Sequence, residues 1–203
     1  LHYNISEHHS PRASFLTFLY SIINVLEDVL PLKRVDVMES LQKLAEVKNE
    51  INFSNLNQKN NALELAKWIS GIPLMYYPLG LHAAAVRFKN SMQENAKTHT
   101  IIENVVEASH NGIVAWEKST KVQPILLQGT DDYIKTKERW KILKEYFNEK
   151  DIEYQEVFSK DGSILSKLVC LIYQLDLTSI YHAGISGIDP SPVNSIDFVK
   201  KRL

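Results

Sequence analysis

From residue 72 onward the sequence alternates between short apolar segments and longer amphipathic ones, and this alternation constrains the fold more than any other feature. Four segments are typical of buried strands: IPLMYYP (72–78), HTIIEN (99–104), PILLQG (124–129) and EYQEVF (153–158). Helical patterns at 79–97 and 132–148 separate them, and in the second we expect Ile134, Trp140 and Phe147 to point inward. Parallel neighbours need a crossover, so this order predicts an α/β fold: a three-layer parallel sheet with helices on both faces.

Helical periodicity also predicts elements on either side of the alternating part. Apolar residues recur at steps of three and four over 15–29, and indicate a well-buried helix that Pro31 ends. A narrower apolar stripe at 35–50 indicates a linking helix. The Asn-rich stretch 52–61 is typical of a loop or domain boundary before a helix at 62–70. Two closing helices are expected at 163–182 and 194–202.

Composition narrows the classes of function and partner. The chain has 203 residues, 44% of them hydrophobic, which is enough to bury a core. Its net charge of -1 does not favour a nucleic acid or an anionic membrane as partner. The one cysteine, Cys170, lies in an apolar run and is expected to be a buried hydrophobe, which fits a reducing cytoplasm. The clustered His2, His8 and His9 are more typical of a mobile terminus than of a metal site, so no metal is expected.

Ligands of such a sheet bind outside the carboxyl ends of the strands, where loops enter helices. Three loops qualify, at 78–81, 104–112 and 129–132, and Glu107 lies in the middle one. A carboxylate at this place is either a helix cap stabilised by the helix dipole or a base delivered to a pocket. The second role requires partial desolvation, because that raises the affinity of the carboxylate for a proton. Spacing alone leaves both interpretations open.

Two further groups of polar residues are candidates. His110 and Asn111 follow Glu107, although a lone histidine is more often a hydrogen-bonded structural residue and Asn-Gly indicates only a tight turn. Glu94 and Asn95 lie at the end of the 79–97 helix and precede a strand, where a sheet would deliver polar groups.

Taken together, four pieces of the sequence resemble a known family. They are SPRASF (10–15), RFKNSMQENAK (87–97), EASHNGIVAWE (107–117) and IDPSPVNSIDFVKKRL (188–203). In order and spacing they are similar to the bifunctional phosphoglucose/phosphomannose isomerases of archaea and bacteria, which have the sugar isomerase (SIS) fold, flavodoxin-like, and belong to the phosphoglucose isomerase superfamily. The similarity implies an aldose-ketose isomerase that interconverts glucose 6-phosphate, and mannose 6-phosphate, with fructose 6-phosphate, and that uses neither a cofactor nor a metal.

The resemblance also implies roles for residues. Glu107 matches the base that moves a proton through a cis-enediolate, and Arg12 matches the arginine that stabilises the developing negative charge. Lys200 matches a lysine that acts during ring opening. His110, then His99 and His182, are candidates for the ring-opening histidine, which in relatives comes from the neighbouring subunit. Asn111, Glu94 and Asn95 are expected to bind substrate beside Arg12.

Two departures and the domain organisation complete the expectations. The family pattern is usually His-Asn-Glu where this chain has His110-Asn111-Gly112. It is usually Asn-Glu-Asn where this chain has Gln93-Glu94-Asn95. Relatives carry two SIS domains, so residues 1–50 are expected to be the tail of a first domain with linking helices, and 51–203 the second domain. In relatives the loops that grip phosphate belong mostly to the first domain. We therefore expect a homodimer that binds a sugar phosphate; a non-catalytic SIS module that binds a sugar phosphate is the alternative.

Overall fold

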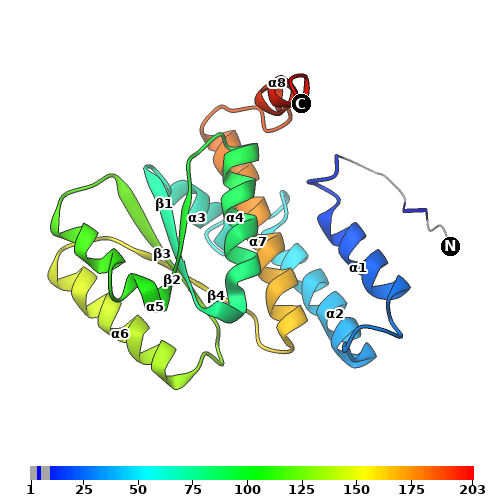
Figure 1. Ribbon diagram of the computed structural model, residues 1–203, viewed down its shortest axis with the longest axis horizontal. Helices are drawn as coiled ribbons and strands as arrows, with labels where there is room; N and C mark the ends of the chain where they lie inside the picture. Colours follow the sequence, from blue (N-terminus) through cyan, green and yellow to red (C-terminus); the bar gives the residue numbers. More distant parts are fainter. Residues whose placement is uncertain (1–3, 6–9) are drawn as a thin grey trace.

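The centre of the protein is a four-stranded parallel sheet with the strand order β2-β1-β3-β4 (Figure 1). The computed structural model describes residues 4–5 and 10–203. The strands are β1 (Ile72–Tyr77), β2 (Ile101–Asn104), β3 (Val122–Gln128) and β4 (Gln155–Phe158). In the register, Met75 of the inner strand β1 lies opposite Ile102 of β2 and Ile125 of β3. The predicted parallel sheet is confirmed, and its strand order is that of flavodoxin-like folds.

Helices cover both faces of the sheet, so the predicted three layers are confirmed. One face carries α3 (Asn61–Trp68), α4 (His82–Asn95) and α7 (Ile164–Ile185). The short helix η1 (Leu79–Leu81) leads into α4. The other face carries α5 (Val105–Ala108), the 3-10 helix η2 (Gly112–Glu117) and α6 (Ile134–Glu149). Side chains alternate along β1, because Met75 packs toward α4 and α7 whereas Tyr76 packs toward α6. Trp140 and Phe147 are buried as expected, but Ile134 is 59% exposed because it begins α6 before the helix meets the sheet.

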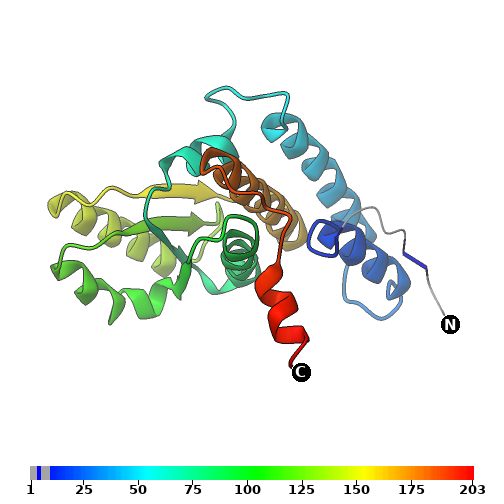
Figure 2. The same ribbon diagram turned by 90° about the horizontal axis from the view of Figure 1, so that it is seen from above.

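Helix α7 is the central helix of the molecule and packs against α2 (Arg34–Ile51), α3 and α4. By length and composition it could cross a membrane, yet more than half of its most apolar stretch is buried within the protein. Cys170 on this helix is buried, and burial raises the pKa of its thiol to about 11. The expectation of a buried cysteine is confirmed. In Figure 2, α7 lies between the sheet and the pair α1 and α2.

Polar contacts fix α2 to its neighbours. Glu39 accepts hydrogen bonds from Ser163 N and Ser166 Oγ, both at 2.9 Å, at the start of α7. These contacts hold the pKa of the Glu39 carboxyl well below its ordinary value, at about 2, with the Ser163 N–H as the main cause. At the other end of α2, the buried Asn60 caps α3 and donates to Tyr181 Oη and to Ile51 O. Helix α2 is thereby held to α7 at both of its ends.

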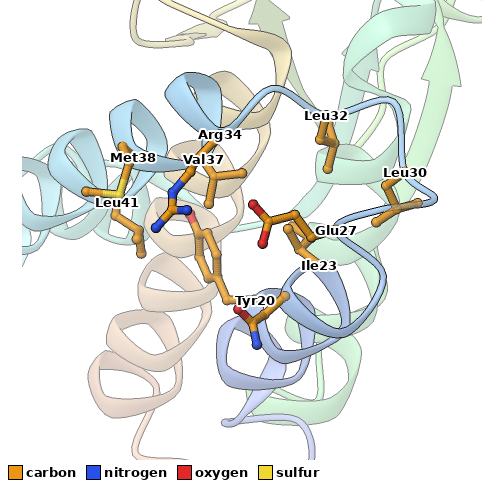
Figure 3. A pocket seen from close by; sticks show the side chains of 10 residues that line it. Tyr20, Ile23, Glu27, Leu30, Leu32, Arg34, Val37, Met38 and Leu41 are labelled. Carbon is orange, nitrogen blue, oxygen red and sulfur yellow. The ribbon is translucent and has the colours of Figure 1, made fainter.

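The first helix differs from the expectation. Helix α1 (Phe15–Val25) ends four residues before Val29, and a turn leads on to Pro31. Of its residues only Ile23 is buried, while Ile22 is 50% exposed and Val29, beyond the helix, 78%. The prediction of a well-buried helix was wrong, because among the described residues α1 packs on one side only. A pocket of about 230 Å³ opens between α1 and α2, with an apolar wall beside Glu27 and Arg34 (Figure 3).

Candidate functional site

The carboxyl end of β2 carries the residues that the sequence placed in the middle loop. Asn104 ends the strand and caps α5, accepting a hydrogen bond from Val106 N through Oδ1 at 2.9 Å. Asn104 is therefore the cap, and the side chain of Glu107, one helical turn further, is exposed. The backbone oxygen of Glu107 accepts hydrogen bonds from His110 N and Asn111 N, each at 2.9 Å. These bonds hold the side chains of Glu107, His110 and Asn111 on one short exposed turn.

Glu103 is a second carboxylate at this place, and sequence reasoning missed it. It lies in β2 opposite Tyr76 and is partly buried. Burial, and then the charge of Glu107, raise the pKa of the Glu103 carboxyl. Its position as the next-to-last residue of a strand, at the edge where ligands bind, was the signal that could have identified it.

Gly112, where the resemblance implied a glutamate, lies against Glu103. A Cβ atom on Gly112 would lie 2.6 Å from Glu103 Oε2 and 2.7 Å from Glu103 Oε1. The Glu103 carboxylate therefore occupies the space into which a side chain at position 112 would extend. A carboxylate is thus present under the His110-Asn111-Gly112 turn, supplied by the strand and not by the turn itself.

His110 also faces a basic surface on α6. An open pocket of about 540 Å³ lies between α5 and α6 and is lined by His110, Lys135 and Arg139 together with the apolar Val106 and Ile142. Both cations are already engaged: Lys135 pairs with Glu138 at 2.8 Å, and Arg139 donates to the backbone oxygen of Lys135. The positive charge of this pocket is therefore partly neutralised.

Arg12 lies among a different set of partners. Its Nη1 is 3.0 Å from Glu94 Oε1, and its Nη2 donates to the backbone oxygens of Pro190 and Ser191 at 2.9 and 2.7 Å. The side chains of Arg12 and Glu94 are 18% and 32% exposed, so the pair is only partly open to solvent. The structure thus brings together two of the predicted substrate-binding residues, at the C-terminal end of α4.

The neighbouring residues on α4 hold this arrangement in place. Asn95 is buried and donates from Nδ2 to Ser179 Oγ at 2.9 Å, which ties α4 to α7. Arg87 forms a forked ion pair with Asp176 of α7 and donates to the backbone oxygen of Arg12. A cavity of about 370 Å³ lies beside these groups and is lined by Arg12, Arg87, Asn95 and Asp176 among others.

Within one chain, the predicted residues form two groups. Helix α4 ends before β2 begins, and α5 starts where β2 ends, so Glu94 and Glu107 lie at opposite ends of that strand. Arg12 is paired with Glu94 and so lies at the same end of β2 as Glu94. Lys200 is exposed at the end of α8 (Asn194–Lys200). Figure 1 places α8 above the end of α4 and away from α5. A site that uses Glu107 together with Arg12 or Lys200 would need a second copy of the chain.

The other histidines considered from the sequence are placed as follows. His182 is buried and its Nδ1 lies 3.1 Å from the backbone oxygen of Ala66, so it belongs to the core, whereas His99 is exposed. His2, His8 and His9 lie outside the described residues. Within residues 4–5 and 10–203, no three His, Cys, Asp or Glu side chains are grouped so that they could hold a metal ion.

Comparison with known proteins identifies the type of domain. A sequence model described as the bacterial phospho-glucose isomerase C-terminal SIS domain matches residues 58–203. The bifunctional phosphoglucose/phosphomannose isomerase of Aquifex aeolicus is 30% identical over 189 residues, which cover 91% of this chain and 58% of the relative. The enzyme of the same description from Caldicellulosiruptor bescii is 27% identical, with coverage of 82% and 51%. The chain thus spans little more than half the length of these relatives.

Solved structures support the fold. A glucose-6-phosphate isomerase like protein from Thermus thermophilus superposes with a TM-score of 0.65 at 19% identity, over 79% of this chain and 56% of that one. A glucosamine-6-phosphate deaminase from Thermotoga maritima superposes with a TM-score of 0.52 at 9% identity, over 92% of this chain and 54% of that one. At these identities the likeness establishes the fold alone.

Proposed function

We propose that this chain, which belongs to the family of bacterial phosphoglucose isomerase C-terminal SIS domains, is the C-terminal part of an aldose-ketose isomerase. The enzyme interconverts glucose 6-phosphate, and also mannose 6-phosphate, with fructose 6-phosphate through a cis-enediolate. The observation that carries the proposal is the family match over residues 58–203, joined by 30% identity to a bifunctional phosphoglucose/phosphomannose isomerase.

In this proposal Glu107 is the base. Its side chain is exposed on α5 at the carboxyl end of the sheet, so the partial desolvation that a base requires would have to come from a partner that closes over it. Burial, and then the charge of Glu107, raise the pKa of the neighbouring Glu103, which places a second carboxylate of increased proton affinity beside the proposed base. His110 is the ring-opening histidine and Asn111, beside it, binds the sugar. The negative charge of the enediolate requires a fixed cation, for which we propose Arg12 and Lys200.

The separation of these groups within one chain supports a shared site. Glu107 lies at one end of β2, whereas Arg12, Glu94 and Asn95 lie at the other and Lys200 is on α8. We therefore propose a homodimer in which Glu107 and His110 of one subunit meet Arg12, Lys200 and the substrate-binding groups Glu94 and Asn95 of the other. The location proposed is the cytoplasm, and the ligand is a sugar phosphate.

The chain is also proposed to contain parts of two domains. We propose that residues 1–50 are the tail of a first SIS domain with linking helices and that 51–203 are the second. Exposed apolar groups support this division because a further domain could cover them: Ile22 of α1, Val29 in the turn after it, and the pocket of Figure 3. Such a domain would also supply the groups that grip phosphate.

Replacement of the base tests the proposal. In the full natural chain, Glu107→Gln is expected to lower kcat for fructose 6-phosphate formation by roughly 10²- to 10⁴-fold, the usual contribution of general acid-base catalysis. Glu117→Gln, an exposed glutamate at the end of η2, is the matched control and should keep the wild-type rate. A Glu107→Gln protein with wild-type turnover would remove Glu107 from the mechanism.

The alternative is a non-catalytic SIS module that binds a sugar phosphate, and Gly112 in place of the usual glutamate is the observation that favours it. A full natural chain whose melting temperature rises with fructose 6-phosphate, yet which shows no turnover, would establish this alternative and exclude the enzyme.

A further inference from the structure

The C-terminal arm, residues 186–203, consists of a linker followed by α8. None of the residues of α8 is buried, and the apolar Ile196, Phe198 and Val199 are 40%, 58% and 52% exposed. Figure 2 shows α8 projecting from the rest of the molecule. A helix of seven residues is too short to be stable by itself in water. The position of α8, and its helical state, therefore depend on how its linker is attached.

Two cations bind the linker at its backbone oxygens. Arg12 Nη2 donates to the oxygens of Pro190 and Ser191 at 2.9 and 2.7 Å, and Lys97 Nζ donates to the oxygen of Pro192 at 2.8 Å. Hydrogen bonds with a charged donor are the stronger class. Three consecutive carbonyl groups are thus bound by two side chains that come from before α1 and after α4.

The end of α4 holds both cations. Glu94 accepts from Arg12 through Oε1 at 3.0 Å, and its backbone oxygen accepts from Lys97 Nζ at 2.6 Å. Lys97 has a positive φ of 56°, which turns the chain at the end of the helix and brings its amino group back over the last carbonyls. A positive charge at this place is also favourable to the helix dipole.

Further contacts complete the arrangement. Arg87 donates to the backbone oxygen of Arg12 and pairs with Asp176 of α7, so the backbone of Arg12 is fixed as well as its side chain. In the linker, Asp189 Oδ1 accepts from Ser191 N at 2.8 Å. The Ser191 N–H, and to a smaller degree the charges of Lys97 and Arg12, lower the pKa of the Asp189 carboxyl. The linker thus offers both carbonyl dipoles and a carboxylate to the two cations.

We propose that Arg12 and Lys97 form a clamp on the carbonyl groups of residues 190–192, and that this clamp sets the position of α8 and hence of Lys200. Lys97 is then a positioning residue, since it acts on the reaction through Lys200 and does not itself touch the sugar. The clamp itself is a property of this chain. Only its effect on catalysis rests on the proposed function.

Hydrogen exchange measured by mass spectrometry tests the clamp in the chain as it stands. Lys97→Met keeps the length of the side chain and removes the donor, and should speed amide exchange in residues 194–203 by about tenfold or more, given the strength of hydrogen bonds to charged groups. Lys97→Arg should restore slow exchange. Lys89→Met, on α4 about two turns before Lys97, is the control and should match the wild type. Unchanged exchange in Lys97→Met would overturn the clamp.

Activity then tests the positioning role separately. In the full natural chain, Lys97→Met should lower kcat with KM little changed, and Lys97→Arg should recover kcat. Faster exchange in Lys97→Met together with a wild-type kcat would overturn the link between the clamp and Lys200. If the wild type does not turn over fructose 6-phosphate, the proposed function fails, while the exchange experiment still decides the clamp.

Discussion

The ion pair between Arg87 and Asp176 joins α4 to α7 and offers a stability test with a defined magnitude. Arg87 Nε lies 2.9 and 3.1 Å from the two carboxylate oxygens of Asp176, and Nη2 lies 2.8 Å from one of them. The guanidinium also lies 4.9 Å from the centre of the Phe15 ring. The two side chains are only 21% and 25% exposed. Loss of Arg87 would therefore leave a largely buried carboxylate with Ser91 Oγ as its remaining donor.

Breaking a fully buried pair costs about 3 to 5 kcal/mol, and with the partial exposure of this pair we expect Arg87→Met to cost about 2 to 3 kcal/mol. In a double-mutant cycle with Asp176→Asn, the coupling free energy should be about 1 to 2 kcal/mol. The exposed pair Lys67 and Glu64, 52% and 41% exposed, is the control and should couple by less than about 0.5 kcal/mol. Urea unfolding at pH 7 measures all of these quantities.

Two results would refute this reasoning. An Arg87→Met protein that loses less than about 1 kcal/mol would mean that the pair is effectively solvated. A coupling free energy no larger than that of the exposed pair would mean that the forked geometry adds nothing beyond a surface contact.

Two predictions concern pH. The pKa of Glu39 is lowered to about 2, so its contribution to stability is fully present above its ordinary pKa of 4.5 and is lost as the pH falls toward 2. Glu39→Gln should therefore lower the melting temperature at pH 7 and match the wild type near pH 2. A constant difference in melting temperature across this range would contradict the assignment. The pKa of Glu103 is raised by burial and by the charge of Glu107, so ionisation of this carboxyl opposes folding above its ordinary pKa of 4.5. Glu103→Gln should therefore raise the melting temperature at pH 7 but not at pH 4. A loss of stability in Glu103→Gln at pH 7 would show that the charged form is favoured.

Sequence patterns predicted the elements well where periodicity reports directly on burial. All four strands coincide with predicted segments, although β3 begins at Val122, ahead of the predicted start at 124, because alternation and apolar runs reflect the two covered faces of the sheet. Periodicity also identified α1, but it shows only that a helix has an apolar face and not what covers it. Ile22 of α1 is half exposed for that reason, although the pattern resembles that of a core helix.

The candidate site could be predicted only in its local part. Glu107, His110 and Asn111 follow one another closely, so a single turn places them together. The partners of Arg12 are 82 residues away at Glu94 and 178 at Pro190, and no local pattern reports on contacts at that separation. Glu103 was missed because its raised proton affinity comes from burial in the fold and from the charge of Glu107, and local periodicity does not report the burial of a single carboxylate.

The central claim is that Glu107 moves a proton between two carbons of a sugar phosphate. The most direct measurement is the incorporation of deuterium from D₂O into the substrate carbons during incubation of fructose 6-phosphate with the full natural chain, followed by NMR. A carboxylate base that exchanges with solvent predicts that the wild type and Glu117→Gln label the sugar, whereas Glu107→Gln labels it at least about 10²-fold more slowly. Equal labelling by the wild type and Glu107→Gln would contradict the account.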